Sequence, residues 1–240
     1  MSSRTWSINQ DGFEVLRAAC QKDSLRELDE ILSAVSRLDL RNVRQRGAET
    51  YAMRNVLREN RLVATLRKLD SLISAVKGYT GKCCAVRGIY FDKPFKANWS
   101  VPWHQDLTIA VAGKHEVDGY SKWTTKSGVV HVQPPTEILE KMITARIHLD
   151  DADERNGALM VVAKSNQRGY IPAREVREVT MKSEVARCDV QRGDIMLMRP
   201  LLLHSSRSSQ TNLRRRVLHI EFCAEELPTP LEWCDRIDLG

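Results

Sequence analysis

The sequence predicts a mainly β protein, a barrel or jelly roll, in which helices cover one face. Two observations predict this fold class. Over the first 80 residues apolar residues recur every three or four positions, as they do in amphipathic helices. From Lys82 the chain changes to short runs rich in Val, Ile and aromatic residues, separated by turn-forming residues, as in β cores. With 240 residues, the chain can form a single domain with a full core.

Two helices are expected in the first part of the chain. Ser24 and Glu27 have the spacing of an N-terminal capping box and precede apolar residues at positions 25, 28, 31, 32 and 35. A second apolar stripe runs from Leu62 to Val76, and Gly78 supplies a left-handed stop. Because each stripe lies on one face of its helix, both helices should pack on one sheet of the β part.

The expected strands occupy the runs 83–91, 101–111, 143–150, 158–163, 185–190, 195–198, 201–204 and 215–223. Turn signals such as Asn156-Gly157 and Arg192-Gly193-Asp194 separate several of them. The segment 112–137 is long for a connection between strands, so we expect it to be a lid over a functional site. The single domain 1–240 is therefore divided into a mainly helical part (1–80), a β core (81–223) and a C-terminal tail (224–240).

Charge and composition exclude several classes of partner. The net charge is +6, but Lys and Arg are spread along the chain and mixed with acidic residues, so no nucleic-acid partner is expected. The run Arg214-Arg215-Arg216 falls in a predicted strand, where alternation sends its members to opposite faces. The six cysteines form no Cys-x-x-Cys pair and are expected to be reduced and buried. No leader-like or membrane-spanning stretch is present, which favours the cytoplasm and no membrane partner.

Three segments place a histidine and a carboxylate two residues apart, on one face of a strand. They are His104-Gln105-Asp106, His148-Leu149-Asp150 and His219-Ile220-Glu221. A non-haem iron that binds a bidentate co-substrate and dioxygen needs such a pair and a second, later histidine. The third segment has no histidine after it, and the second runs into an acidic turn, where a core or rim histidine is expected. The first lies among apolar residues, where either a metal or a simple hydrogen bond would compensate its carboxylate.

The later histidine is His204, which follows an apolar run, and Arg215 comes eleven residues after it. An arginine that enters a barrel is costly unless it meets an anion, and its planar group suits a carboxylate. On these residues alone, Arg215 could equally be a surface arginine beside a structural histidine.

Taken in order, five motifs resemble the phytanoyl-CoA dioxygenase (PhyH) family over nearly the whole chain. They are Trp103-His104-Gln105-Asp106, Asn156-Gly157-Ala158-Leu159, Arg192-Gly193-Asp194, Leu203-His204-Ser205-Ser206 and Arg215-Arg216. Gln10-Asp11-Gly12-Phe13 also resembles the family's opening. In one departure, Ala163-Lys164-Ser165-Asn166 stands where relatives commonly carry Pro-Gly-Ser-His.

The resemblance implies a double-stranded β-helix (jelly-roll, cupin-like) core. It further implies that His104, Asp106 and His204 bind Fe(II), and that Arg215 and Ser206 bind the co-substrate 2-oxoglutarate. Trp123 falls near a family tryptophan and is assigned to the co-substrate site on the same basis.

The implied activity is that of a dioxygenase that uses O2 and hydroxylates an unactivated C–H bond, with release of succinate and CO2. The carboxylate of Asp106 disfavours halogenation, because related halogenases carry a small residue there. Basic residues before the first iron motif and in the segment 112–137 favour a small anionic or carrier-linked substrate. They are Arg87, Lys93, Lys96, Lys114, Lys122 and Lys126. Two alternatives stay open: a cupin-like isomerase or lyase, which would not need Arg215, and a degenerate fold that acts as a binding protein.

Overall fold

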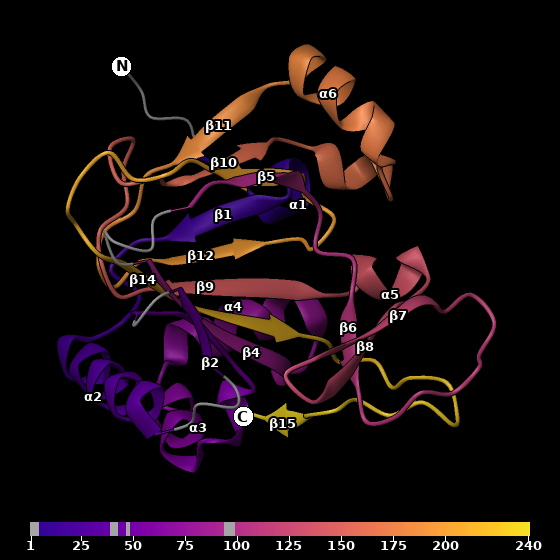
Figure 1. The fold of residues 1–240 in the computed structure, drawn as a ribbon, viewed down its shortest axis with the longest axis horizontal. Helices are drawn as coiled ribbons and strands as arrows, with labels where there is room; N and C mark the ends of the chain where they lie inside the picture. The colour runs from indigo at the N-terminus through magenta and orange to yellow at the C-terminus, as the bar shows by residue number, and fades with distance from the viewer. Residues whose placement is uncertain (1–4, 39–42, 47–48, 94–98) are drawn as a thin grey trace.

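The computed structural model describes residues 5–38, 43–46, 49–93 and 99–240. Two antiparallel sheets face each other, and helices cover the outer face of the larger one (Figure 1). The α-helices are α1 (Ile8–Asp11), α2 (Lys22–Leu38), α3 (Asn60–Leu66), α4 (Asp70–Thr80), α5 (Thr136–Glu140) and α6 (Ala173–Lys182), with 3-10 helices at Val56–Arg58 and Ser165–Arg168. No helix among these described residues is long and apolar enough to cross a membrane.

The main sheet has eight strands, and every neighbouring pair is antiparallel. In spatial order they are β1 (Phe13–Leu16), β12 (Ile195–Met198), β9 (Ile143–His148), β14 (Arg215–Phe222), β4 (Cys84–Lys93), β3 (Glu49–Arg54) and β2 (Val43–Arg46), with β15 (Ile237–Asp238) paired to β4. The first part of the chain thus contributes strands as well as helices, and the tail returns to the sheet through β15.

The second sheet is formed by β11 (Val185–Cys188), β10 (Leu159–Val162), β13 (His204–Ser206) and β5 (Val101–His104), in that order. Its inward side chains pack against those of the main sheet. Phe13 and Met196 of the main sheet lie in one buried cluster with Val161 and Ala186 of the second. The predicted fold class, a jelly roll with helices on one sheet, is therefore confirmed.

The helices bury the outer face of the main sheet. Alternation along β9 and β14 turns Ile147 and Leu218 outward, where they share a core with Leu28 of α2 and Leu72 of α4. The second predicted helix is in fact two, α3 and α4, and the chain leaves α4 at Gly81 (φ +77°) instead of Gly78.

The segment 112–137, where a lid was expected, contains regular secondary structure. It forms a β-hairpin of β7 (Ser121–Lys126) and β8 (Val129–Gln133), which pairs with β6 (Ile109–Val111) in a third sheet. Ser127 and Gly128 both have positive φ, as a two-residue hairpin turn requires. This sheet packs on the C-terminal tail through Trp233, beside α5 and away from the second sheet (Figure 1).

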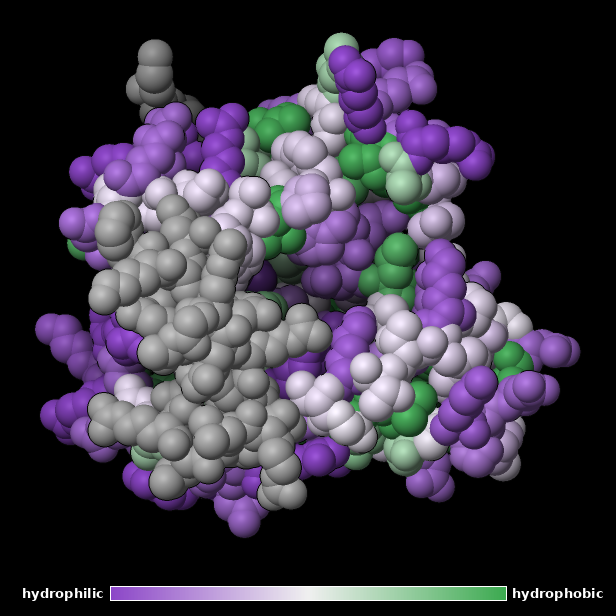
Figure 2. Space-filling view, in the orientation of Figure 1, coloured by the Kyte–Doolittle hydropathy of each residue, from purple (hydrophilic) through white to green (hydrophobic). Residues whose placement is uncertain are grey.

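Most of the other expected strands are found, with two changes. The run 101–111 is divided into β5 and β6, and the run 201–204 becomes a strand only at His204. The described part of the face in Figure 2 mixes polar and apolar residues and shows no broad hydrophobic patch.

Candidate active site

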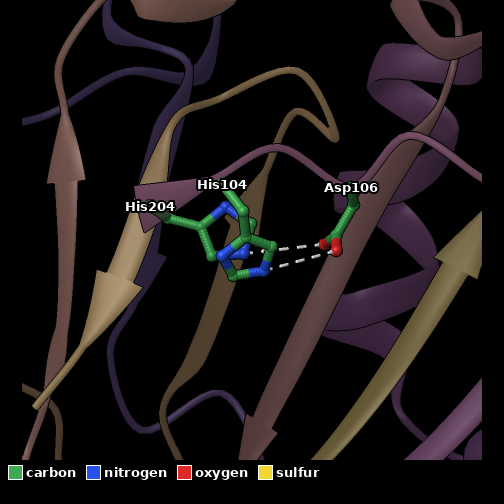
Figure 3. A group of neighbouring side chains, drawn as sticks. All are labelled: His104, Asp106 and His204. Atoms are coloured by element: carbon green, nitrogen blue, oxygen red, sulfur yellow. Dashed lines mark ion pairs between the residues drawn. The ribbon is translucent and has the colours of Figure 1, made fainter. Parts of the chain in front are cut away.

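Three predicted ligands meet where the second sheet ends. His104 closes β5 and His204 opens β13, and the two residues are direct partners across these neighbouring strands. Their ring centroids are 4.2 Å apart. The Asp106 carboxylate lies 3.9 Å from Nε2 of His104 and 3.7 Å from Nε2 of His204, so both rings point at it (Figure 3). Each of the three residues offers one ligand atom, and these atoms lie within 4.8 Å of one another.

Both histidines are held in the tautomer that a metal needs. Nδ1 of His104 lies 2.9 Å from the carbonyl of Pro102, and Nδ1 of His204 lies 2.8 Å from that of Leu202. Because a carbonyl only accepts, each Nδ1 carries the proton and each Nε2 presents a lone pair. Burial lowers the pKa of His204 to about 4, so this ring is neutral at physiological pH.

Asp106 is the anionic member of the predicted ligand set. Its backbone N–H donates to the carbonyl of Pro200 (2.9 Å), which fixes the residue beside β13. Burial by itself would raise the pKa of Asp106. At the low pH where this carboxyl titrates, however, the protonated rings of His204, His219 and His104, together with Arg87, bring its pKa below the ordinary value. Its buried Oδ2 has no hydrogen-bond partner in the described structure. A divalent cation would satisfy this oxygen, and two imidazoles with one carboxylate are the donor set of non-haem Fe(II) sites.

A pocket of about 190 Å³ opens beside these ligands. It is lined by Phe91, Lys93, Trp99, Val101, His104, Asp106, Arg146, Leu159, His204, Ser205, Ser206, Arg215, Val217 and His219. The structure therefore brings five of the six predicted site residues together: the three ligands, Ser206 and Arg215.

Arg215 enters the pocket from the first position of β14. Its Nη1 donates to the carbonyl of Gly157, its Nε has no partner, and no described carboxylate forms an ion pair with it. Burial, followed by the charge of Arg146, lowers its pKa to about 10. Its neighbours Arg214 and Arg216 point to the other face, where they pair with Asp92 and Asp150, as alternation predicts. Arg215 is thus a buried cation that lacks an anion.

Trp123 does not line this pocket, contrary to its expected place in the co-substrate site. It lies on β7 of the third sheet, half-buried against the cluster that contains Val132 and Trp233. The hairpin places it there: β7 pairs with β8, β8 pairs with β6, and no residue of these three strands lines the pocket.

The basic residues expected near the site fall into two groups, one beside the pocket and one at the third sheet. Lys93 and Arg87 are on the inward face of β4, and Lys93 lines the pocket, whereas Lys114 and Lys122 are exposed near or on the third sheet. Lys93 donates to the carbonyl of Arg207 (2.8 Å), and burial, followed by the charge of Arg215, lowers its pKa to about 7. Lys96 lies outside the described residues.

Two further residues line the pocket: Arg146, which the sequence analysis did not name, and His219, which it considered only as part of a metal motif and set aside. Nη1 of Arg146 lies 3.1 Å from Nδ1 of His219, and Nε2 of His219 lies 3.3 Å from Glu221, which also pairs with Arg87. The signal was present: polar residues alternate with apolar ones along β9 and β14. Among the described residues, His219 and Glu221 are not part of the group that could hold a metal; instead, His219 contacts Arg146. In the second candidate motif, His148 is buried and Asp150 pairs with Arg216.

Gly157 shapes the wall that Arg215 contacts, which gives a testable prediction. It has φ +77°, and an added Cβ would lie 2.3 Å from the backbone oxygen of Arg207. Gly157→Ala should therefore lower the free energy of unfolding by about 2 kcal/mol or more, from backbone strain and the clash together. Gly81→Ala, with the same φ and nothing within 4 Å, is the matched control and should lose only about 1 kcal/mol. Urea denaturation measures both, and equal losses would rule out the close contact.

Comparisons with known proteins identify a family and a fold. The family model for phytanoyl-CoA dioxygenase (PhyH) matches residues 8–217. Comparison with curated protein sequences found no match. Among solved structures, EctD from S. alaskensis in its apo form is similar with a TM-score of 0.71 and 16% identity, over 93% of this chain and 77% of EctD.

Two further structures share the fold. AviO1 from Streptomyces viridochromogenes Tue57 is similar with a TM-score of 0.65 and 20% identity, over 92% of this chain and 93% of AviO1. HygX from Streptomyces hygroscopicus, solved with nickel and 2-oxoglutarate bound, is similar with a TM-score of 0.63 and 14% identity, over 91% and 85% of the two chains. Since the family model covers most of the sequence, this chain belongs to the phytanoyl-CoA dioxygenase (PhyH) family.

Proposed function

We propose that the chain is an Fe(II)- and 2-oxoglutarate-dependent oxygenase that hydroxylates a C–H bond of a small molecule. One observation carries the proposal: two free imidazole Nε2 atoms and an unpartnered carboxylate oxygen converge at a pocket whose wall holds a buried arginine without an anion. The first group fits a ferrous ion and the second fits a carboxylate. Family membership supports the proposal. So do the solved relatives, since EctD has been crystallised with Fe and HygX with 2-oxoglutarate.

His104, Asp106 and His204 would hold Fe(II), and Arg215 and Ser206 would hold the distal carboxylate of 2-oxoglutarate. When bound, the metal supplies a site at which dioxygen oxidises 2-oxoglutarate to succinate and CO2 and a substrate C–H bond is hydroxylated. The protein's part is to position these groups and to exclude water. Phe91, Leu159 and Val217 give the pocket apolar walls, which also strengthen the pairing of Arg215 with its anion.

The substrate is proposed to be small, because the pocket is small and the co-substrate would occupy part of it. The fold itself does not choose the reaction: a solved relative, SnoN, is described as an epimerase. The carboxylate of Asp106 disfavours halogenation, and hydroxylation is proposed as the default outcome among the remaining reactions, which include desaturation and cyclisation.

The test is an anaerobic titration of the purified protein with Fe(II) and then with 2-oxoglutarate. Formation of the complex is measured by the visible charge-transfer band of the iron-bound 2-oxoglutarate. Wild-type protein should show the band, and His104→Ala should lose it because two protein ligands do not hold the metal. His115→Ala, which removes an exposed histidine, is the control and should keep the band. A folded wild-type protein that binds a divalent metal but gives no band would contradict the proposal and favour a cupin-like enzyme.

A further inference from the structure

The pocket contains a second buried arginine whose charge no described carboxylate neutralises. Arg146 is 8% exposed and lies on the inward face of β9. Its Nη1 contacts His219, its Nε has no partner, and it forms no ion pair with a described carboxylate. Two guanidinium groups, Arg146 and Arg215, thus line one small cavity. Burying such charges is costly unless an anion pairs with them.

The hydrogen bonds of Arg146 leave its charge in place. Because an arginine has no acceptor, Nδ1 of His219 must accept from it, so the proton of the neutral imidazole is on Nε2 and faces Glu221. Glu221 is already paired with Arg87. Its carboxylate is therefore shared between one guanidinium and one imidazole, and it does not reach Arg146.

The two arginines lie at different levels of the pocket. On neighbouring strands Arg146 is opposite His219, four residues along β14 from Arg215. Four residues correspond to roughly 13 Å along a strand. The charge of Asp106 acts on Arg146, which places it at the metal end, whereas Arg215 contacts Gly157 at the other end. Long, flexible side chains can bring both groups towards one ligand between them.

We propose that Arg146 is a second carboxylate-binding residue, so that the pocket holds a dicarboxylate at both ends, Arg215 at the distal end and Arg146 at the metal end. The proposal rests on the proposed function, in which the dicarboxylate is 2-oxoglutarate. Arg146 then binds and orients the carboxylate nearest the metal. It selects a dianion over a monoanion even before a metal is bound.

The experiment uses the metal-free protein, with EDTA present, and isothermal titration with two probes of equal chain length. Glutarate carries a carboxylate at each end and pentanoate carries only one. Wild-type protein should bind glutarate more tightly than pentanoate by about tenfold or more, as one charge-assisted hydrogen bond provides. Arg146→Met should lose this preference, while its affinity for pentanoate, held by Arg215, stays near that of the wild type.

Two further variants separate binding from a structural role. Arg146→Lys keeps the charge and should retain part of the preference, whereas Arg177→Met, which removes an exposed arginine, should behave as the wild type. Arg146→Met should also unfold at an unchanged or higher temperature, because it removes a buried, unpaired cation.

Arg146→Met protein that still prefers glutarate as strongly as the wild type overturns the proposal, and any anion that Arg146 binds then belongs to the substrate. A wild-type protein that gives the charge-transfer band but has no preference for glutarate also overturns it, while the proposed function stands. Conversely, a wild-type protein that prefers glutarate over pentanoate but gives no charge-transfer band would support dicarboxylate binding by the two arginines and contradict the proposed function.

Discussion

Replacing Asp106 by alanine is expected to lower the affinity for Fe(II) by more than about a hundredfold, since even loss of an outer contact to a metal ligand costs ten- to a hundredfold. In the proposed site Asp106 is the anionic one of three donors. Its Oδ1 faces His104, and its Oδ2, which has no hydrogen-bond partner, faces His204. The measurement is thermal unfolding with and without Fe(II) under anaerobic conditions. A metal that binds the folded state raises the unfolding temperature of the wild type, and this increase should vanish in Asp106→Ala.

Asp118→Ala is the matched control, because Asp118 is an exposed aspartate in the segment before β7. It should show the full increase in unfolding temperature. If Asp106→Ala protein were still stabilised by Fe(II) to the wild-type extent, the metal would be held elsewhere, and the assignment of this residue as a ligand would be wrong.

The part of the fold that could be predicted from the sequence is the part set by local pattern. The apolar stripe of α2 and the alternation along β9 and β14 each mark a buried face, and these elements are found. The start of α2 differs, because the helix begins at Lys22, before the expected capping box of Ser24 and Glu27. Elements that depend on distant partners were missed. The four residues of β1 form a strand because they pair with β12 at the edge of the sheet, and the sequence Phe13–Leu16 does not indicate this partner. The hairpin of β7 and β8 was not predicted, because the expectation for the segment 112–137 rested on its length and not on its turn residues, Ser127 and Gly128.

The candidate site divides in the same way. His104, Asp106 and His204 are recognisable from spacing and order, and the structure brings their side chains together. Trp123 was assigned by its approximate position along the chain, which says nothing about the sheet it joins. Arg146 was missed because a lone arginine in an apolar strand resembles an outward-facing residue. Only the neighbouring strands show that its face of β9 is the inside of the barrel.

Replacing Arg215 by methionine should weaken the binding of 2-oxoglutarate to the Fe(II)-loaded protein by about ten- to a hundredfold, the value of a charge-assisted pair to a carboxylate. The charge-transfer band should still form, at a higher 2-oxoglutarate concentration, because the metal ligands are untouched. Stability should change little: the lost hydrogen bond to the Gly157 carbonyl, worth about 1 kcal/mol, is offset by the removal of a buried cation.

The chemistry of the ligand makes this prediction specific. The ligand 2-oxopentanoate has the same 2-oxo-carboxylate end as 2-oxoglutarate but no distal carboxylate. Arg215→Met should therefore not alter the affinity for 2-oxopentanoate, and the variant should bind the two ligands about equally. A similar loss for both ligands would mean that the substitution disturbs the metal end of the pocket as well. Arg215 would then be a residue that supports the wall at Gly157, and the anion held inside the barrel would have to be assigned to Lys93 and Arg146, the other buried cations of the pocket.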